Sequence, residues 1–126
     1  MKLLLVDDSR TMRNIMKKTL DTLGGVDFSE ASDGHEALKV IAATPAGFDL
    51  ILVDWNMPNM DGITLIHKIR DTDKKTPLMM VTTEAEKSRV IEAIKAGVNN
   101  YAVKPFTPEA LLDKVKQTLS KAKAAA

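Results

Sequence analysis

Short runs of consecutive apolar residues recur along the chain and predict the strands of its core. Four such runs span Leu3–Val6, Leu50–Val53, Leu78–Val81 and Tyr101–Val103. Unbroken apolar runs of this length are typical of strands that are buried on both faces, as in a parallel sheet. A fifth segment, Val26–Ala31, alternates apolar and polar residues and predicts an edge strand.

Between these strands the apolar residues recur three or four positions apart, which is the period of a helix with one buried face. Five helices are expected, and their apolar positions are, in chain order, Met12, Ile15, Met16, Leu20 and Leu23; Ala37, Leu38, Ile41 and Ala42; Ile63, Ile66 and Ile69; Val90, Ile91 and Ile94; and Leu111, Leu112, Val115 and Leu119. Gly97 is expected to end the fourth helix. Thr107 and Pro108 are expected to begin the fifth, as N-cap and first helical residue.

Strands that alternate with helices predict an α/β fold, a doubly wound five-stranded parallel sheet with five helices on its two faces, because right-handed crossovers permit little else. A chain of 126 residues is long enough for one domain with a real core. We expect residues 1–120 to form this domain, and the Ala/Lys-rich residues 121–126 to form a C-terminal tail.

Charge and composition exclude several classes of partner. The chain carries 18 basic and 17 acidic residues without long runs of one sign, so neither a nucleic-acid footprint nor a basic membrane patch is expected. It has no cysteine, which excludes disulfides and thiolate metal sites. No apolar stretch approaches the roughly 20 residues of a membrane span. We expect a cytoplasmic monomer that binds neither nucleic acid nor membrane.

Chemistry-bearing residues follow the predicted strands directly, and strands of a parallel sheet end at one common edge. They are Asp7 and Asp8, Asp54, Thr82 and Thr83, and Lys104. A single Asp at a strand end is commonly a turn former. Two carboxylates about 4 Å apart, however, repel by roughly 4 kcal/mol at an effective dielectric of about 20, so three together must protonate or bind a cation. With oxygen donors alone, Mg²⁺ is expected, with Mn²⁺ or Ca²⁺ as substitutes.

These residues lie in the segments "LLLVDDS", "DWNMPNMDG", "VTTEA" and "YAVKPF". In that order the segments resemble the receiver domain of two-component response regulators over nearly the whole chain, and within that family the stand-alone chemotaxis regulators. The resemblance implies a flavodoxin-like receiver fold with strand order 2-1-3-4-5. It also implies a phosphoacceptor switch rather than an enzyme. The partners it implies are a sensor histidine kinase as donor, the flagellar motor switch protein as target, and a phosphatase.

Carried over residue by residue, the resemblance assigns a reaction site. Asp54 would accept the phosphoryl group, and Asp7 and Asp8 would hold Mg²⁺ together with Asp54 and the backbone carbonyl of Asn56. Lys104 would neutralise a phosphoryl oxygen, and the family's cis peptide bond before Pro105 would turn this lysine inward. A strand that ends in Asp54 then serves to aim the nucleophile at the donor phosphorus.

The resemblance assigns further residues to the switch. The Thr82 hydroxyl would move toward the new phosphoryl group, and Tyr101 would swing inward to fill the space left behind. Asn56 and Glu84 match positions that tune the lifetime of the acyl phosphate. Lys114 matches the partner-docking face made by the fourth helix, fifth strand and fifth helix. Because side chains alternate along an extended segment, Trp55 is expected beside the acidic site and partly exposed.

Three other interpretations conflict with particular residues of the sequence. A haloacid-dehalogenase-like phosphatase needs a second acid where Asn56 stands. A flavodoxin needs donors for the flavin phosphate where "DDSRT" places anionic side chains. An EF-hand needs Gly and Glu where Asn59 and Leu65 stand. One alternative stays open, a receiver domain of a non-chemotaxis or multidomain response regulator with transcriptional or enzymatic output.

Overall fold

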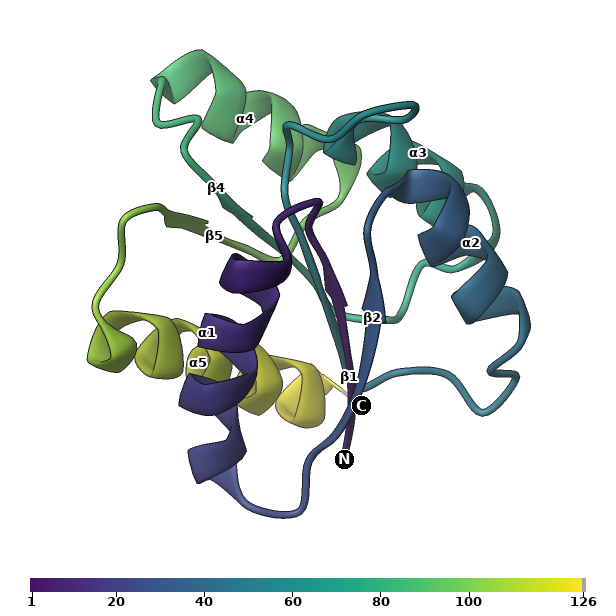
Figure 1. The fold of residues 1–126 in the computed structure, drawn as a ribbon. Helices are drawn as coiled ribbons and strands as arrows, with labels where there is room; N and C mark the ends of the chain where they lie inside the picture. The colour runs from purple at the N-terminus through teal and green to yellow at the C-terminus, as the bar shows by residue number, and fades with distance from the viewer. Residues whose placement is uncertain (126) are drawn as a thin grey trace.

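The computed structural model describes residues 1–125 and shows a single central sheet between two layers of helices (Figure 1). All strand pairs are parallel, and the order across the sheet is β2-β1-β3-β4-β5. The strands are β1 (Lys2–Val6), β2 (Asp27–Ala31), β3 (Leu50–Val53), β4 (Leu78–Thr82) and β5 (Asn100–Val103). The predicted α/β fold, its strand order and the edge position of β2 are confirmed.

Helices connect the strands, and α1 and α5 cover one face of the sheet while α2, α3 and α4 cover the other (Figure 1). Their bounds are α1 (Arg10–Leu20), α2 (Gly34–Ala42), α3 (Gly62–Thr72), α4 (Lys87–Ala96) and α5 (Pro108–Ala125). Leu23, expected in the first helix, lies instead in a short 3₁₀ helix, Asp21–Leu23. This tighter turn precedes Gly24 and Gly25, whose positive φ angles end helical geometry.

Both faces of the sheet are buried because neighbouring residues of each strand point to opposite layers. Leu3, Leu5, Leu50 and Leu52 pack toward α1 and α5, whereas Leu4, Val6, Ile51 and Val53 pack toward α2, α3 and α4. Burial of each such side chain contributes about 1.5–3 kcal/mol. The two-sided core explains why the strands appear in the sequence as unbroken apolar runs.

Helix ends follow the local signals of the sequence. The Thr107 hydroxyl accepts a hydrogen bond from the Ala110 N–H at 3.1 Å, and Gly97 ends α4 with a φ of 116°. The prediction for α4 itself is partly wrong, because Ile91 and Ile94 are exposed. The helix instead turns the small side chains of its neighbouring stripe, including Ala93, into the core.

The Ala/Lys-rich segment continues α5 as far as Ala125, and position 126 of the predicted tail lies outside the described residues. The domain boundary at residue 120 stays a prediction. Within residues 1–125, no helix is both long and apolar enough to cross a membrane.

Candidate functional site

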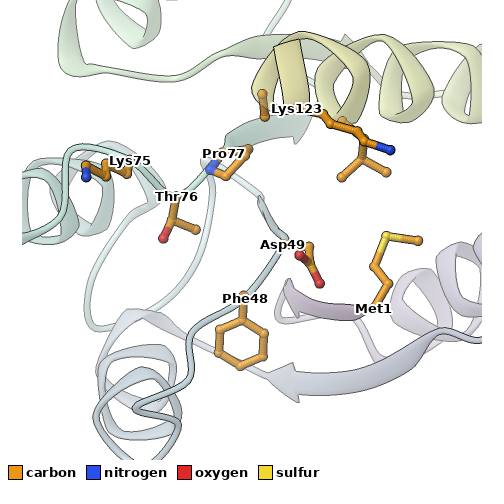
Figure 2. Close-up of a pocket in the computed structure, with 9 residues that line it drawn as sticks. Met1, Phe48, Asp49, Lys75, Thr76, Pro77 and Lys123 are labelled. Atoms are coloured by element: carbon orange, nitrogen blue, oxygen red, sulfur yellow. The ribbon is translucent and has the colours of Figure 1, made fainter. Parts of the chain in front are cut away.

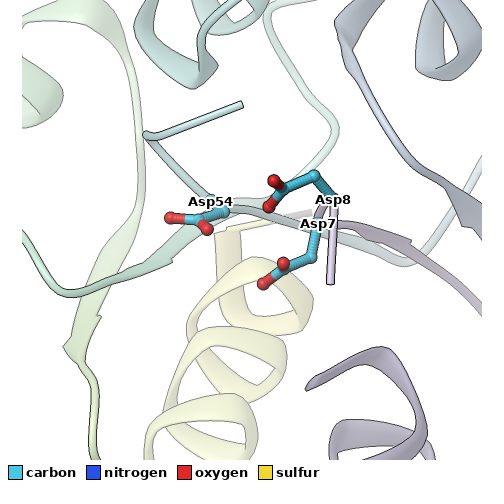
Figure 3. Close-up of side chains that lie close together, drawn as sticks. All are labelled: Asp7, Asp8 and Asp54. Atoms are coloured by element: carbon cyan, nitrogen blue, oxygen red, sulfur yellow. The ribbon is translucent and has the colours of Figure 1, made fainter. Parts of the chain in front are cut away.

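Three carboxylates converge at the carboxyl edge of the sheet, as Figure 3 shows. β1 and β3 are neighbours, and the N–H of Asp54 donates to the Val6 carbonyl at 2.9 Å, which places the residues after both strands side by side. Asp7, Asp8 and Asp54 each offer one oxygen within 4.8 Å of the others. This all-oxygen set fits a hard divalent cation.

Asp7 is the most firmly held member of the cluster. Its side chain is 1% exposed, whereas Asp8 lies in solvent. The Ser9 N–H donates to Asp7 Oδ1 at 2.9 Å, and Arg13 Nη1 donates to the Asp7 carbonyl at 2.5 Å. Burial raises the pKa of Asp7, and the hydrogen bonds from Lys104 and the Ser9 N–H offset only part of that rise. No sequence pattern pointed to Arg13, because its contact with Asp7 depends on how α1 packs.

Lys104, which follows β5, bridges the two buried acids. Its Nζ lies 2.7 Å from Asp7 Oδ2 and 3.2 Å from Asp54 Oδ2, and the peptide bond to Pro105 is cis, as expected. Burial alone would lower the pKa of Lys104. The hydrogen bond to Asp7 and the charge of Asp54 together raise it by more than burial lowers it, so the pKa lies above its ordinary value. The site therefore holds a charged ammonium against the Asp54 carboxylate.

Four predicted residues meet where the loop after β4 begins. Thr82 is fully buried, and its hydroxyl accepts from the Glu84 N–H at 3.4 Å. Tyr101 is buried, and its Oη donates to the Glu84 carbonyl at 2.5 Å. Asn56 Nδ2 donates to the Glu84 side chain at 3.3 Å. Burial, with a smaller effect of the Glu84 charge, raises the pKa of Tyr101. Tyr101 thus already points inward in this structure.

The expected exposure of Trp55 is wrong, since its side chain is only 4% exposed. The chain turns directly after β3, and the indole packs into the core while Arg89 from α4 lies over it, 5.0 Å from the ring centroid. This is a cation–π contact. No local pattern connects Arg89 to Trp55, because they approach only through the packing of α4 beside the β3–α3 loop.

Gly62 packs against the backbone of Asp54, a contact that the sequence analysis did not predict. A Cβ at Gly62 would overlap the Asp54 carbonyl oxygen and lie 2.9 Å from the Trp55 Cα. The Gly62 N–H donates to the Trp55 carbonyl at 2.8 Å. The first turn of α3 therefore rests directly on the backbone that carries Asp54. The Asp61-Gly62 pair at the start of α3 is the sequence feature that could have indicated this contact.

Lys114 lies on α5, and its carbonyl accepts from Asn100 Nδ2 at 3.2 Å, near the start of β5. The structure thus places it away from the acidic cluster, which follows the opposite ends of the strands.

A separate hollow lies at the amino edge of the sheet (Figure 2) and is lined in part by Met1, Phe48 and Pro77. None of the predicted site residues lines it, so the functional candidate is the carboxyl edge.

The model of the response regulator receiver domain family matches residues 3–116. The chain belongs to this family. It is 50% identical over 121 residues to the chemotaxis protein CheY1 of Helicobacter pylori, covering 94% of this chain and 97% of that protein. It is 45% identical over 119 residues to the chemotaxis protein CheY of Pseudomonas aeruginosa, covering 93% and 94%.

Solved receiver structures have the same fold. A CheY-like receiver domain protein of Methanospirillum hungatei superposes with a TM-score of 0.89 at 28% identity, covering 99% of this chain and 98% of that one. CheY of Borrelia burgdorferi, solved in a complex with CheX, BeF₃ and Mg²⁺, superposes with a TM-score of 0.86 at 27% identity, covering 92% and 87%. The resemblance drawn from the motifs is confirmed. The protein is a receiver-type signalling domain rather than a classical enzyme, and its acidic cluster is consistent with Mg²⁺ binding.

Proposed function

We propose that this protein is a phosphorylation-activated switch in which Asp54 accepts a phosphoryl group from a sensor histidine kinase. The observation that carries the proposal is the setting of Asp54, at the end of a central strand, 7% exposed, with the Lys104 ammonium 3.2 Å from one oxygen. Two further carboxylates, of Asp7 and Asp8, complete the cluster. This arrangement positions a nucleophile and counters charge, which are the main requirements of phosphoryl transfer.

In the reaction, an oxygen of Asp54 attacks the phosphorus of the donor, and the bond to the leaving group breaks with the electron pair going to that group. The product is an acyl phosphate on Asp54. Lys104 Nζ, now shared between Asp7 and Asp54, would donate to a phosphoryl oxygen. The Asn56 N–H, 3.4 Å from Asp54 Oδ1, orients the other side of the carboxylate.

The carboxylates of Asp7, Asp8 and Asp54 and the carbonyl of Asn56 would hold Mg²⁺, with Mn²⁺ or Ca²⁺ as substitutes. The ion supplies charge neutralisation for the incoming phosphoryl group. The protein's own contribution is to keep these oxygens together, through the Ser9 N–H and Arg13 on Asp7.

The output of the switch would run through Thr82 and Tyr101. A phosphoryl group on Asp54 offers oxygens that the buried Thr82 hydroxyl can donate to, and Tyr101 shares the Glu84 backbone with it. A coupled shift of these residues would change α4 and β5, where Ile91, Ile94 and Val103 are exposed. This face, with Lys114 on α5, is the proposed docking surface for the flagellar motor switch protein in a cytoplasmic chemotaxis pathway.

Asn56 and Glu84 would set the lifetime of the signal. Their side chains are hydrogen-bonded at 3.3 Å and line one groove together with Asp8, from which they could direct water or a phosphatase toward the acyl phosphate. The complex with CheX formed by the Borrelia burgdorferi relative supports the phosphatase as a partner class.

A fluorescence titration tests the proposal through Trp55, the single tryptophan of the chain. Trp55 and Asp8 line the same groove, so charge added at the site should alter the indole emission. Mg²⁺ should change it saturably, beryllofluoride should change it further only with Mg²⁺ present, and Asp54→Asn should abolish the second change. A flat titration of protein shown to be folded by circular dichroism would refute the proposed function.

A further inference from the structure

The loop between β3 and α3 contains an unusual backbone turn. Asn59 has a φ of 68°, and within residues 1–125 it is the only residue other than glycine with a positive φ. The Met60 N–H donates to the Pro58 carbonyl at 2.7 Å, which closes a three-residue turn around Asn59. Backbone of this kind persists where neighbouring structure holds it in place.

The neighbouring structure that holds Asn59 is the start of α2. Asn59 Nδ2 donates to Asp33 Oδ2 at 3.0 Å. Asp33 is itself fixed, because its Oδ1 accepts from the Glu36 N–H at 2.9 Å as the N-cap of α2. The turn is therefore tied to a carboxylate whose position a helix determines.

The next residue of the loop makes a second contact with the same helix end. A Cβ at Gly34 would lie 2.6 Å from the Met60 Sδ and 2.9 Å from the Met60 Cβ, and Met60 is buried. Two consecutive loop residues thus dock on two consecutive residues at the start of α2. The tip of the loop is held by packing as well as by a hydrogen bond.

At its base the same loop is closed by the hydrogen bond from Gly62 to Trp55. Asn56 lies between this base and the docked tip, and its N–H approaches Asp54 Oδ1. We infer that Asn59, acting through Asp33, is a positioning residue that fixes the Asn56 backbone for metal binding beside Asp54. The inference rests on the proposed function, because that function makes the Asn56 carbonyl a ligand.

A reversal of the hydrogen bond provides the test. Asn59→Asp places two carboxylates against each other and breaks the contact, whereas the double variant Asp33→Asn with Asn59→Asp restores it with donor and acceptor exchanged. Asn is as good an N-cap as Asp, so α2 keeps its cap. Ser32→Ala is the matched control. The Ser32 hydroxyl donates to the Glu36 side chain at the same helix end, and it forms no hydrogen bond with Asn59 or Met60 among the described residues.

Mg²⁺ affinity is measured by calorimetry, and the exchange of the Gly62 amide hydrogen is measured without metal. Asn59→Asp should weaken Mg²⁺ binding about tenfold, the lower end of the range for residues that support metal ligands. The added negative charge of Asn59→Asp would by itself tighten Mg²⁺ binding. A loss of Mg²⁺ affinity would therefore show that the ligands are mispositioned. The Gly62 amide should exchange faster in the same variant. The double variant should restore both quantities, and Ser32→Ala should change neither.

Unchanged Mg²⁺ affinity in Asn59→Asp, or a double variant that stays weak, would overturn the inference. If Asn59→Asp does not fold, Asn59→Gly replaces it, because glycine accepts the positive φ. That variant should lose affinity without losing thermal stability, and a parallel loss of both would assign Asn59 a structural role only. Wild-type protein that binds no Mg²⁺ would refute the proposed function instead, and amide exchange would then decide separately whether Asn59 holds the loop.

Discussion

Tyr101 and Glu84 are joined by a short hydrogen bond from the phenol Oη to the Glu84 carbonyl, 2.5 Å long. The side chain of the same Glu84 accepts from Asn56, in the loop that follows β3. Glu84 is therefore held at its backbone by Tyr101 and at its side chain by the loop between β3 and α3. This gives a physical connection between the site and the face formed by α4 and β5.

Tyr101→Phe removes the donor of this bond and leaves the ring in place. We expect the free energy of unfolding to fall by about 1 kcal/mol, the usual net contribution of one hydrogen bond. Urea denaturation measures it. Asn56→Ala, which removes the contact to the exposed end of Glu84, is the control and should change stability by less than about 0.5 kcal/mol. Equal stability of Tyr101→Phe and wild type would show that the bond does not hold the loop.

Lys104→Ala removes the cation between Asp7 and Asp54. The metal-free protein should lose about 3 kcal/mol of stability, because a buried pair is broken and two buried acids are left facing each other. Mg²⁺ should still bind, since lysine is no ligand. Removal of the ammonium also removes a positive charge that repels the divalent ion, so Mg²⁺ binding should tighten.

Calorimetry measures the Mg²⁺ affinity of Lys104→Ala. The control is Lys116→Ala, since Lys116 is exposed on α5. Phosphorylated Lys104→Ala should also fail to favour the partner-binding state, because the charge contact that couples phosphoryl to switch is missing. Weaker Mg²⁺ binding in the variant, or partner binding equal to that of phosphorylated wild type, would contradict the role given to Lys104.

Gly62→Ala forces a methyl group into the backbone of Asp54. We expect a loss of about 3 kcal/mol, as for overpacking against atoms that cannot move freely. Gly47→Ala separates this clash from backbone strain, since Gly47 has a φ of 81° but open space around it. The control should lose only about 1 kcal/mol, the cost of a left-handed residue. Thermal denaturation compares the two. Because Gly62 has no positive φ, a loss in Gly62→Ala no larger than that of the control would show that the backbone of Asp54 accommodates the methyl group.

Much of this fold was predictable because burial on both faces leaves a direct trace in the strands, as in Leu50–Val53, which the structure reproduces residue for residue. The acidic cluster was predictable for a related reason, since parallel strands end at one edge. Contacts that depend on how helices pack were not predictable. Ile91 and Ile94 have the correct spacing for burial, yet α4 buries its neighbouring stripe. Trp55 is covered by Arg89, which no local pattern links to it.

Glu30 on β2 provides a pH test of the scaffold. Its carboxylate lies 2.9 Å from both Arg13 Nε and Lys17 Nζ, and these contacts, that with Lys17 foremost, lower the pKa of Glu30 below its ordinary value of 4.5. A lowered pKa stabilises the fold above the unfolded-state pKa, and that stabilisation is lost as pH falls through the folded-state value.

Glu30→Gln should therefore be less stable than wild type at neutral pH by about 0.2–1 kcal/mol, the usual range for exposed ion pairs. The difference should disappear as the pH falls below 4.5 and through the lowered pKa. Denaturant titrations across this range measure it. A difference that persists at acid pH would assign the effect to packing rather than to charge.

The most direct test of the central claim is the intact mass of the protein after incubation with acetyl phosphate and Mg²⁺. Wild-type protein should gain the mass of one phosphoryl group, which tandem mass spectrometry should locate on Asp54. Folded Asp54→Asn should gain none, because Asp7, which also follows a strand and contacts Lys104, is only 1% exposed and is held by the Ser9 N–H, while the exposed Asp8 has no ion pair to Lys104 within residues 1–125. A phosphoryl group on Asp54→Asn, or a folded wild-type protein that gains no mass, would contradict the account.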